Sequence, residues 1–357
     1  MQGRPLEGMQ VPHAASPRLL ISRMSAIGDT VLTLPVLCAL RRAFPQAFIA
    51  WVVERAAAPM LHNHDCLNEL IVLPRLWFKS PLEIWRFRSR LRALRIDATI
   101  DPQSITKTAI ACWLSGARRR IGFEGHYGKE ASRWLNNERL VHRQPHITDR
   151  SLELLEPLGV QPGPAEFRIP HNAKAEATIA SYLNGVRLES GFAIVNPGAR
   201  WDSKLWPSDR YVHVVRDLAG SFGLRSIAVW AGDRERAWAE EIVQAAPDAT
   251  LLAPPTDLYE LTALLRRARI FVGSDTGPMH TAAAVGTPCV AMYGTTRPED
   301  CGPYGPQHIA LQARYDDGSR SERRRATNDA MCLITAEQVL AACHEILSRK
   351  CQPRAAA

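Results

Sequence analysis

The stretch of sequence best suited to chemistry runs from Val272 to His280 and reads Val-Gly-Ser-Asp-Thr-Gly-Pro-Met-His. An apolar strand is expected to end at Val272, and Pro278 suits the first turn of a helix. The unpaired N–H groups at such a helix start can bind an anion, and Thr276 adds a hydroxyl. A phosphate-binding turn is therefore favoured over a plain capped turn. A lone histidine usually packs in a core, but the place of His280 at the head of this helix favours a side chain that points into the cleft.

A second loop, residues 196–207, combines a glycine with two cations. Gly198 follows an apolar strand, so backbone there can approach a ligand closely. Arg200 and Lys204 bring positive charge to the same loop, which suits a phosphate or diphosphate. Trp206 and Pro207, which precede a helical pattern, are interpreted as packing and a helix start.

Two acidic positions follow strands in the same way. Asp29 ends the loop Ser-Ala-Ile-Gly-Asp, where it either caps the helix or acts as a general base that the helix field keeps ionised. The loop has neither a P-loop nor a dinucleotide fingerprint, and local pattern alone favours capping. Asp233 and Glu235 either accept hydrogen bonds from ribose hydroxyls or pair with neighbouring arginines at the surface.

Short apolar strands alternate with helical patterns along the whole chain, which predicts βαβ units and parallel sheets. The expected strands are 18–22, 48–53, 70–73, 98–101, 192–196, 226–230, 251–252, 270–272 and 289–293. The expected helices are 30–44, 105–114, 173–183, 208–222, 258–268, one that begins near 278, and 336–347. Residues 315–328 are charged and are expected to form a surface loop.

A Pro- and Gly-rich segment at 159–170 separates two arrays of similar size and marks a domain boundary. We expect an α/β protein with two doubly wound Rossmann-like domains that face each other across a central cleft. Ligands of such sheets bind beyond the carboxyl ends of the strands, where the loops above lie. The expected division is a tail at 1–17, domains at 18–170 and 171–335, and a terminal helix and tail at 336–357.

Composition narrows the class of protein. The chain has 357 residues, which is long enough for two packed cores. Its aromatic content of 7% and mean hydropathy of −0.17 exclude a disordered or fibrous protein. No uninterrupted apolar run reaches the ~18 residues of a membrane span, and the start has no signal-peptide core, so secretion is not expected. Eight scattered cysteines without a CxxC pair support neither a disulfide framework nor a zinc site, and reduced thiols are expected.

Positive charge is concentrated in the first half of the chain. Residues 1–170 hold 23 Lys and Arg against 15 Asp and Glu, whereas the remainder is balanced at 21 against 21. In that half Trp77-Phe78-Lys79 precedes a helical pattern rich in arginine. Basic residues beside exposed aromatics suit an anionic lipid surface, although an ordinary amphipathic helix explains the spacing nearly as well.

Taken together, these loops resemble the heptosyltransferases of glycosyltransferase family 9, which build the inner core of lipopolysaccharide. The resemblance covers residues 19–347. It is carried by residues 25–29 with 34–35, 101–107, 116–117 with 121–123, 196–199 with 204–207, and 274–280 with 286–288. The sequence departs from the family pattern at Pro102 and Ser104.

The resemblance implies a GT-B fold and an inverting, metal-independent enzyme without a cofactor. Such an enzyme moves a heptose from ADP-heptose to a phosphorylated glycolipid acceptor of the lipid A–Kdo type. It would act at the cytoplasmic face of the inner membrane, peripherally on an anionic surface and without nucleic acid. Asp29 would be the catalytic base, and Lys204 would neutralise the leaving diphosphate. The donor would be bound by Gly28, Gly198, Arg200, Glu235, Asp275, Thr276, Gly277, Pro278 and His280, and the acceptor by Gln103, Lys107 and Arg120.

Two other functions fit the same residues. One is an enzyme of the same architecture that uses another nucleotide sugar, either as a transferase or as an epimerase of the UDP-N-acetylglucosamine type. The other is a catalytically silent glycolipid-binding module. The carboxylate at Asp29 and the cation at Lys204 speak against a silent module, because binding alone requires neither.

Overall fold

The computed structural model describes residues 16–74, 77–189 and 191–349. The chain divides into two compact units. Unit 1 takes in the described residues up to Ser25 together with 33–166, and unit 2 takes in 26–32 with the described residues from Phe167 onward. Of the N-terminal tail expected at 1–17, only residues 16 and 17 are among the described residues. Cys351 also lies outside the described residues.

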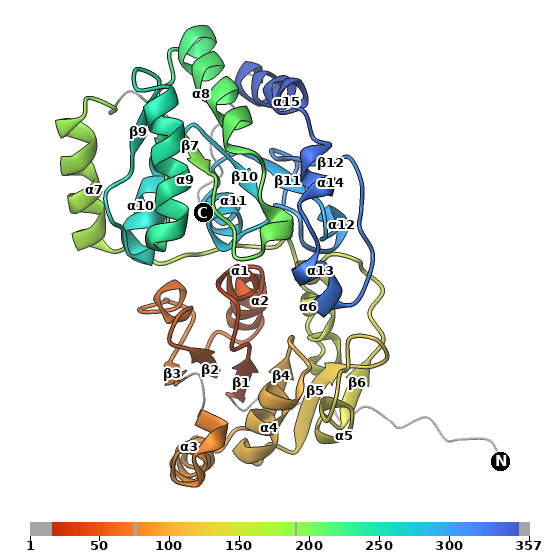
Figure 1. The fold of residues 1–357 in the computed structure, drawn as a ribbon. Coiled ribbons are helices and arrows are strands. Elements are labelled where there is room, and N and C mark those ends of the chain that lie inside the picture. The colour runs from red at the N-terminus through yellow and green to blue at the C-terminus, as the bar shows by residue number, and fades with distance from the viewer. Residues whose placement is uncertain (1–15, 75–76, 190, 350–357) are drawn as a thin grey trace. The chain divides into compact units, whose positions relative to one another are not determined.

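Unit 1 is built on a six-stranded parallel sheet in the order β3-β2-β1-β4-β5-β6 (Figure 1). The strands are β1 (Arg18–Ser22), β2 (Phe48–Glu54), β3 (Glu69–Leu73), β4 (Ala98–Asp101), β5 (Arg119–Phe123) and β6 (Glu138–Leu140). The four strands expected here are confirmed. The last two were not predicted, because their alternation is short and interrupted by arginine.

Helices cover both faces of this sheet. They are α2 (Leu34–Ala43), α3 (Pro81–Ala93), α4 (Thr106–Ser115), α5 (Ser132–Leu135) and α6 (Ile147–Glu153), with 3-10 turns η1 (Ala58–Met60), η2 (Trp77–Lys79) and η3 (Glu156–Leu158). The side chains of Phe87 and Leu91 on α3 pack with Leu20 and Val52 of the strands in one buried cluster.

Unit 2 repeats the architecture, with a parallel sheet in the order β12-β11-β10-β7-β8-β9. The strands are β7 (Ala193–Asn196), β8 (Ser226–Ala228), β9 (Thr250–Leu252), β10 (Ile270–Ser274), β11 (Cys289–Tyr293) and β12 (Ile309–Gln312). The expected strands are again confirmed, with β8 ending earlier than predicted, and β12 is an addition.

The helices of unit 2 include one from the beginning of the chain. They are α1 (Ile27–Val31), α7 (Ala173–Gly185), α8 (Ser208–Phe222), α9 (Gly232–Ala245), α10 (Leu258–Arg267), α11 (Gly277–Ala284), α12 (Pro298–Cys301), α13 (Arg320–Arg325), α14 (Asp329–Cys332) and α15 (Ala336–Ser348), with the 3-10 turn η4 (Asp202–Lys204). The bounds of α8 match the prediction. Helix α9 was not predicted.

Two predictions about helices are corrected. The single helix expected over 30–44 is two helices, because α1 packs on α11 in unit 2 while α2 belongs to unit 1. The loop expected over 315–328 contains α13. Its start is a capping box in which Ser319 Oγ accepts from the Glu322 N–H at 3.3 Å and Glu322 Oε2 accepts from the Ser319 N–H at 2.7 Å.

The order of strands reverses between β1 and β4 in unit 1 and between β7 and β10 in unit 2. Such switch points are where doubly wound sheets bind ligands, beyond the carboxyl ends of the strands. The loops after these four strands carry most of the residues expected to form the site. No helix among the described residues combines the length and the apolar character that a membrane span requires.

Candidate active site

The carboxylate of Asp275 is the centre of a buried polar cluster in unit 2. It follows β10, and Lys204 Nζ donates to its Oδ2 at 2.5 Å. The Thr296 hydroxyl donates to the same oxygen at 2.7 Å, and His280 Nε2 donates to Oδ1 at 2.9 Å. The fold thus brings together three residues expected in the site, Lys204, Asp275 and His280, and adds Thr296.

The cluster determines which of its groups are charged. Burial would raise the pKa of Asp275, but the Lys204 ammonium and the hydrogen bond from His280 together hold this pKa well below its usual value. Cys301 Sγ lies 3.8 Å from Asp275 Oδ2, and burial followed by the Asp275 charge raises the pKa of this thiol. Asp275 is therefore ionised, while Cys301 remains a neutral thiol.

Lys204 is held on a second side by an aromatic ring. Its ammonium lies 4.8 Å from the centre of the Trp201 ring, and Nζ also donates to the Asp275 carbonyl at 3.3 Å. The side chain of Lys204 is 14% exposed. The fold therefore fixes one cation at the carboxyl end of the sheet, as the sequence predicts for a site that binds negative charge.

Helix α11 begins directly after Asp275. Thr276 is its N-cap in extended conformation, but its hydroxyl accepts from Asn196 Nδ2 at 3.1 Å and donates to the Ser274 carbonyl at 3.2 Å, so it does not cap the helix. Gly277 is the first helical residue and Pro278 the second. The first turn of a helix presents backbone N–H groups that attract an anion, as the sequence predicts.

Gly198 lies directly against the carboxylate of Glu235. A Cβ atom on this glycine would be 2.4 Å from Glu235 Cδ, so a larger residue there would require the Glu235 side chain to move. Glu235 Oε2 accepts from the Ala231 N–H at 2.9 Å, and burial raises the pKa of Glu235. Its arginine neighbours pair elsewhere: Arg234 with Asp202 at 2.8 Å and Arg236 with Glu240 at 2.8 Å.

Asn196 was not predicted as part of the site. It ends β7 and is buried, and its Nδ2 donates to the Gly198 carbonyl at 3.3 Å and to Thr276 Oγ1 at 3.1 Å. One side chain thus joins the two loops at the switch point of unit 2. The sequence did offer a signal for Asn196, because an amide side chain at the end of an apolar, and therefore buried, strand needs hydrogen-bond partners.

Asp29 lies on α1 and therefore belongs to unit 2. Its Oδ2 accepts from the Ala26 N–H at 3.0 Å, so it caps its helix, as one of the two interpretations predicts. The charge of Asp29 also contributes, after burial and Asp275, to the raised pKa of Cys301. The Asp29 carboxylate therefore lies near the Asp275 cluster, and capping occupies one of its two oxygens.

Gln103 and Lys107 gather at the carboxyl end of the unit 1 sheet. Gln103 Oε1 accepts from the Met24 N–H at 3.1 Å. Lys107 Nζ donates to Ser25 Oγ at 2.9 Å and to Glu54 Oε1 at 2.5 Å. Both side chains are partly buried, and their hydrogen bonds connect the segment after β4 to the loop after β1 and to the end of β2.

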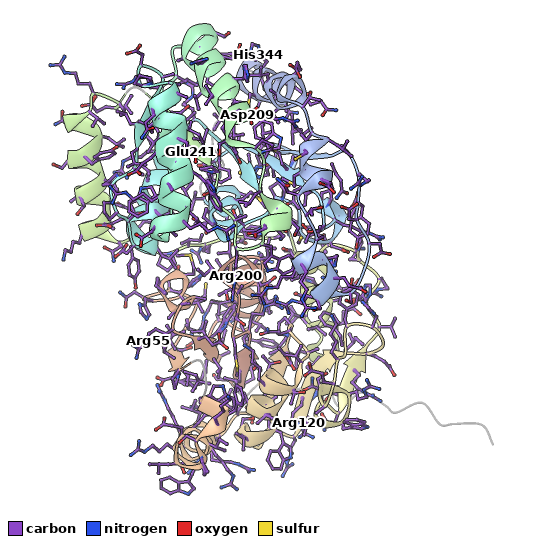
Figure 2. The ribbon with its side chains drawn as sticks, viewed as in Figure 1. Arg55, Arg120, Arg200, Asp209, Glu241 and His344 are labelled. Carbon is purple, nitrogen blue, oxygen red and sulfur yellow. The ribbon has the colours of Figure 1, made fainter. Side chains whose placement is uncertain are left out.

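The two arginines expected in the site have different surroundings. Arg120 is in the first half of β5, opposite Thr99, and donates to the carbonyls of Leu135 at 2.6 Å and Ala117 at 2.8 Å, so the fold does not bring it to Gln103 and Lys107. Arg200 is exposed on the loop after β7 (Figure 2).

Two doubly wound parallel sheets of six strands each are the architecture of GT-B glycosyltransferases. Residues 84–330 match the family described as Glycosyltransferase family 9 (heptosyltransferase). The chain belongs to this family and is a glycosyltransferase.

Individual relatives cover almost the whole chain. Lipopolysaccharide heptosyltransferase 1 of Escherichia coli strain K12 is 27% identical over 307 residues, 83% of this chain and 93% of the relative. The glycosyl transferase family 9 structure from Veillonella parvula DSM 2008 has a TM-score of 0.78 at 22% identity and covers 94% of this chain and 98% of its own. E. coli heptosyltransferase WaaC with ADP-2-deoxy-2-fluoro heptose has a TM-score of 0.73 at 25% identity, with 92% and 99% covered. The expected family and fold class are confirmed.

Proposed function

We propose that this enzyme transfers a heptose from ADP-heptose to an inner-core lipopolysaccharide acceptor of the lipid A–Kdo type, with inversion and without a metal ion. The observation that carries the proposal is the buried cluster of Lys204, Asp275 and His280 beside the start of α11. A cation and a helix start at one switch point suit a diphosphate. The similar WaaC structure holds an ADP-heptose analogue.

Unit 2 is proposed as the donor domain. Negative charge develops on the diphosphate as the bond to the anomeric carbon breaks, and Lys204 with the N–H groups of α11 would stabilise it there. Asp275 would act as a positioning residue, because it holds both Lys204 and His280 by direct contacts. Glu235 and Arg200 would bind the remainder of the nucleotide.

Asp29 is proposed as the base. The acceptor hydroxyl would give its proton to the Asp29 carboxylate while its oxygen forms the new bond to the anomeric carbon. The electron pair of the broken bond would leave with ADP. Attack from the face opposite the leaving group accounts for inversion.

Unit 1 is proposed as the acceptor domain, with Gln103 and Lys107 binding the phosphorylated glycolipid and Arg120, which donates to the Leu135 and Ala117 carbonyls, taking no part. An anionic membrane surface would lie against the region of η2 and α3. Phe78, Leu82 and Trp85 are 42%, 53% and 62% exposed there, among exposed arginines of α3. Trp77, which the sequence suggested as an exposed aromatic, is buried and packs against Phe87, so it takes no part.

A transfer assay tests the proposed reaction. Purified enzyme is incubated with ADP-heptose and a heptose-free lipid A–Kdo glycolipid. The mass of the glycolipid is measured by mass spectrometry, and the released ADP is quantified. A gain of one heptose with matching ADP release is expected, and UDP- and GDP-sugars should give none. Transfer only from another nucleotide sugar, or binding without turnover, would contradict the proposal.

The membrane surface is tested separately. Co-sedimentation with vesicles that contain anionic lipid should be strong, and Leu82→Ser with Trp85→Ser should reduce it several-fold. Trp134→Ser, at an exposed tryptophan of α5, is the matched control. Equal binding to neutral vesicles, or no effect of the α3 changes, would refute this surface.

A further inference from the structure

The polar cluster around Asp275 offers less positive charge than a diphosphate requires. The Lys204 ammonium lies 2.5 Å from the ionised Asp275 carboxylate, so the charges of this pair cancel. The start of α11 adds the equivalent of about half an elementary charge. A diphosphate carries more than one negative charge and gains another when it leaves the sugar. The diphosphate of the proposed donor therefore requires cations beyond this cluster, and this inference rests on the proposed function.

Helix α13 concentrates positive charge. Four of its six residues are arginines. They are Arg320, Arg323, Arg324 and Arg325. Its single acidic residue, Glu322, accepts from the Ser319 N–H at 2.7 Å and so caps the helix. Like charges one turn apart, as at positions 320 and 324, destabilise a helix. Helix α13 therefore keeps an excess of positive charge that its own stability does not favour.

Hydrogen bonds hold the segment of α13 against the two neighbours of Lys204. Ser203 Oγ donates to the Arg323 carbonyl at 2.8 Å. Shortly after the helix, Asn328 Nδ2 donates to the Leu205 carbonyl at 3.0 Å. Ser203 is completely buried, so the contact with α13 is part of the interior of unit 2. The residues directly before and after Lys204 are thus both bonded to this segment.

A further contact joins α13 to the loop after β11. Arg323 Nη1 donates to the Thr295 carbonyl at 3.0 Å. Thr295 is buried, and the hydroxyl of the next residue, Thr296, donates to Asp275 Oδ2 at 2.7 Å. Helix α13 is therefore fixed to two of the segments that supply hydrogen-bond donors to the Asp275 carboxylate.

Three arginines of α13 are exposed and have no side-chain partner among residues 16–74, 77–189 and 191–349. They are Arg320, Arg324 and Arg325. The acidic residues that precede the helix have other partners. Asp316 pairs with Arg314 at 2.7 Å, and Asp317 Oδ1 accepts from the Gly318 N–H at 2.8 Å. The charge of the three arginines is therefore available to a ligand.

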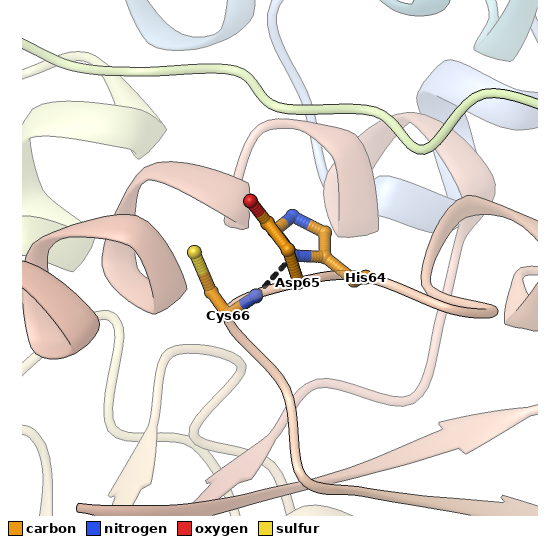
Figure 3. Close-up of side chains that lie close together, drawn as sticks. All are labelled: His64, Asp65 and Cys66. Carbon is orange, nitrogen blue, oxygen red and sulfur yellow. Dashed lines mark hydrogen bonds and ion pairs between the residues drawn. The ribbon is translucent and has the colours of Figure 1, made fainter. Parts of the chain in front are cut away.

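Polar side chains in the loop before β3 of unit 1 present the opposite case. One nitrogen, oxygen or sulfur atom from each of His64, Asp65 and Cys66 lies within 4.8 Å of the other two (Figure 3). The His64 nitrogen that lies 3.2 Å from Asp65 Oδ1 is Nδ1, and it already accepts from the Cys66 N–H at 3.2 Å. These three residues are explained by the turn they form, whereas no such internal contact accounts for the arginines of α13.

We propose that the exposed arginines of α13 bind the diphosphate of the sugar nucleotide, and of the nucleoside diphosphate that leaves after transfer. A guanidinium group can donate two parallel N–H bonds to phosphate oxygens, which an ammonium group cannot do. Because Asp275 neutralises Lys204, α13 supplies the charge that balances the diphosphate as its bond to the sugar breaks. Arg323 is a positioning residue, since its contacts anchor the helix.

Calorimetric titration of the full-length protein with ADP tests the proposal. The combined variant Arg320→Gln, Arg324→Gln and Arg325→Gln should bind ADP about tenfold more weakly or worse, because charge-assisted hydrogen bonds are lost. Adenosine, which has no phosphate, should bind equally well to both proteins. Tm should not fall, since repulsion within the helix is relieved. The affinity for ADP should also depend less on salt in the variant.

A matched control removes three exposed charges from other surfaces. It combines Arg118→Gln, Lys174→Gln and Arg187→Gln and should bind ADP as the unaltered protein does. Equal ADP affinity in the α13 variant and the unaltered protein overturns the proposal, also where the KM for the glycolipid rises, because α13 would then bind a phosphate of the acceptor. Equal weakening in the control variant overturns it as well, since net charge alone would explain the loss.

The titration requires no transfer, so its outcome is separable from that of the proposed reaction. An unaltered protein that binds UDP or GDP and not ADP contradicts the proposed donor. Weaker binding of that nucleotide by the α13 variant would still support α13 as the element that binds the diphosphate. An unaltered protein that binds none of the three nucleotides contradicts both proposals.

Discussion

The backbone of Gly28 rests on the imidazole ring of His280. A Cβ atom at Gly28 would lie 2.4 Å from His280 Cδ2, closer than any side chain tolerates. His280 in turn donates to Asp275, which holds Lys204. A continuous series of contacts therefore joins the helix that carries Asp29 to the lysine proposed to stabilise the leaving group.

Gly28→Ala should disturb this series of contacts. Overpacking costs about 1–3 kcal/mol, so we expect a lower free energy of unfolding in urea and a lower kcat. Gly220→Ala is the matched control, because Gly220 lies on α8 with no atom within 4 Å of a Cβ. That change should stabilise by about 0.5–1 kcal/mol through helix propensity. Unaltered stability and kcat in Gly28→Ala would show that His280 moves aside freely.

Asp29→Asn should separate the two roles of this residue. The amide oxygen can still accept from the Ala26 N–H, so Tm should change little, whereas loss of the base should lower kcat by about 10²–10⁴-fold. Steady-state kinetics with calorimetry measure both. A variant with the unaltered kcat would leave Asp29 as a cap only.

Lys204→Met should lower both stability and rate. It leaves the buried Asp275 carboxylate without its closest cation, and breaking a buried pair costs about 3–5 kcal/mol. Lys204→Met combined with Asp275→Asn should recover much of that stability while turnover stays low, since the leaving group still lacks its cation. Recovery of turnover in the double variant would exclude Lys204 from the transition state.

Asp101 should give a pH dependence in unit 1. It is fully buried at the end of β4, and burial raises its pKa from 3.8 to about 6 despite hydrogen bonds from Asn136 and Ser104. The folded state therefore holds this proton more tightly than the unfolded state, so the contribution of Asp101 to stability falls as pH rises from about 4 to about 6 and is constant above. A shift of about 2 pKa units amounts to about 3 kcal/mol.

Urea unfolding across that pH range checks the effect. Relative to Asp101→Asn, the unaltered protein should lose stability as pH rises. Asp209→Asn, at an exposed position on α8, should show no such trend relative to the unaltered protein. A flat difference for Asp101→Asn would place the Asp101 pKa near its ordinary value.

Periodicity predicted the sheets and the loops that follow their strands, because buried parallel strands are short apolar runs whose ends are marked by Gly, Pro and Asp. The contact between Lys204 and Asp275 could not be predicted in this way. Each residue was expected in the site, but their contact depends on the adjacency of β7 and β10, which only the folded sheet shows.

The sequence failed to predict several contacts of the site and the core for one shared reason. Asn196 and Thr296 act through contacts with distant segments, and Trp77 packs on α3 although it stands beside lysine and phenylalanine in the sequence. Local pattern carries none of this information, because each contact is made only after the chain has folded.

Helix α1 has a consequence for synthesis of the protein. Its residues 26–32 belong to unit 2, although both flanking segments belong to unit 1. No single proteolytic cut can therefore release two complete halves. During translation, α1 also leaves the ribosome long before α11, the helix on which it packs. Residues 26–32 can therefore take their place in unit 2 only after most of the chain has been synthesised.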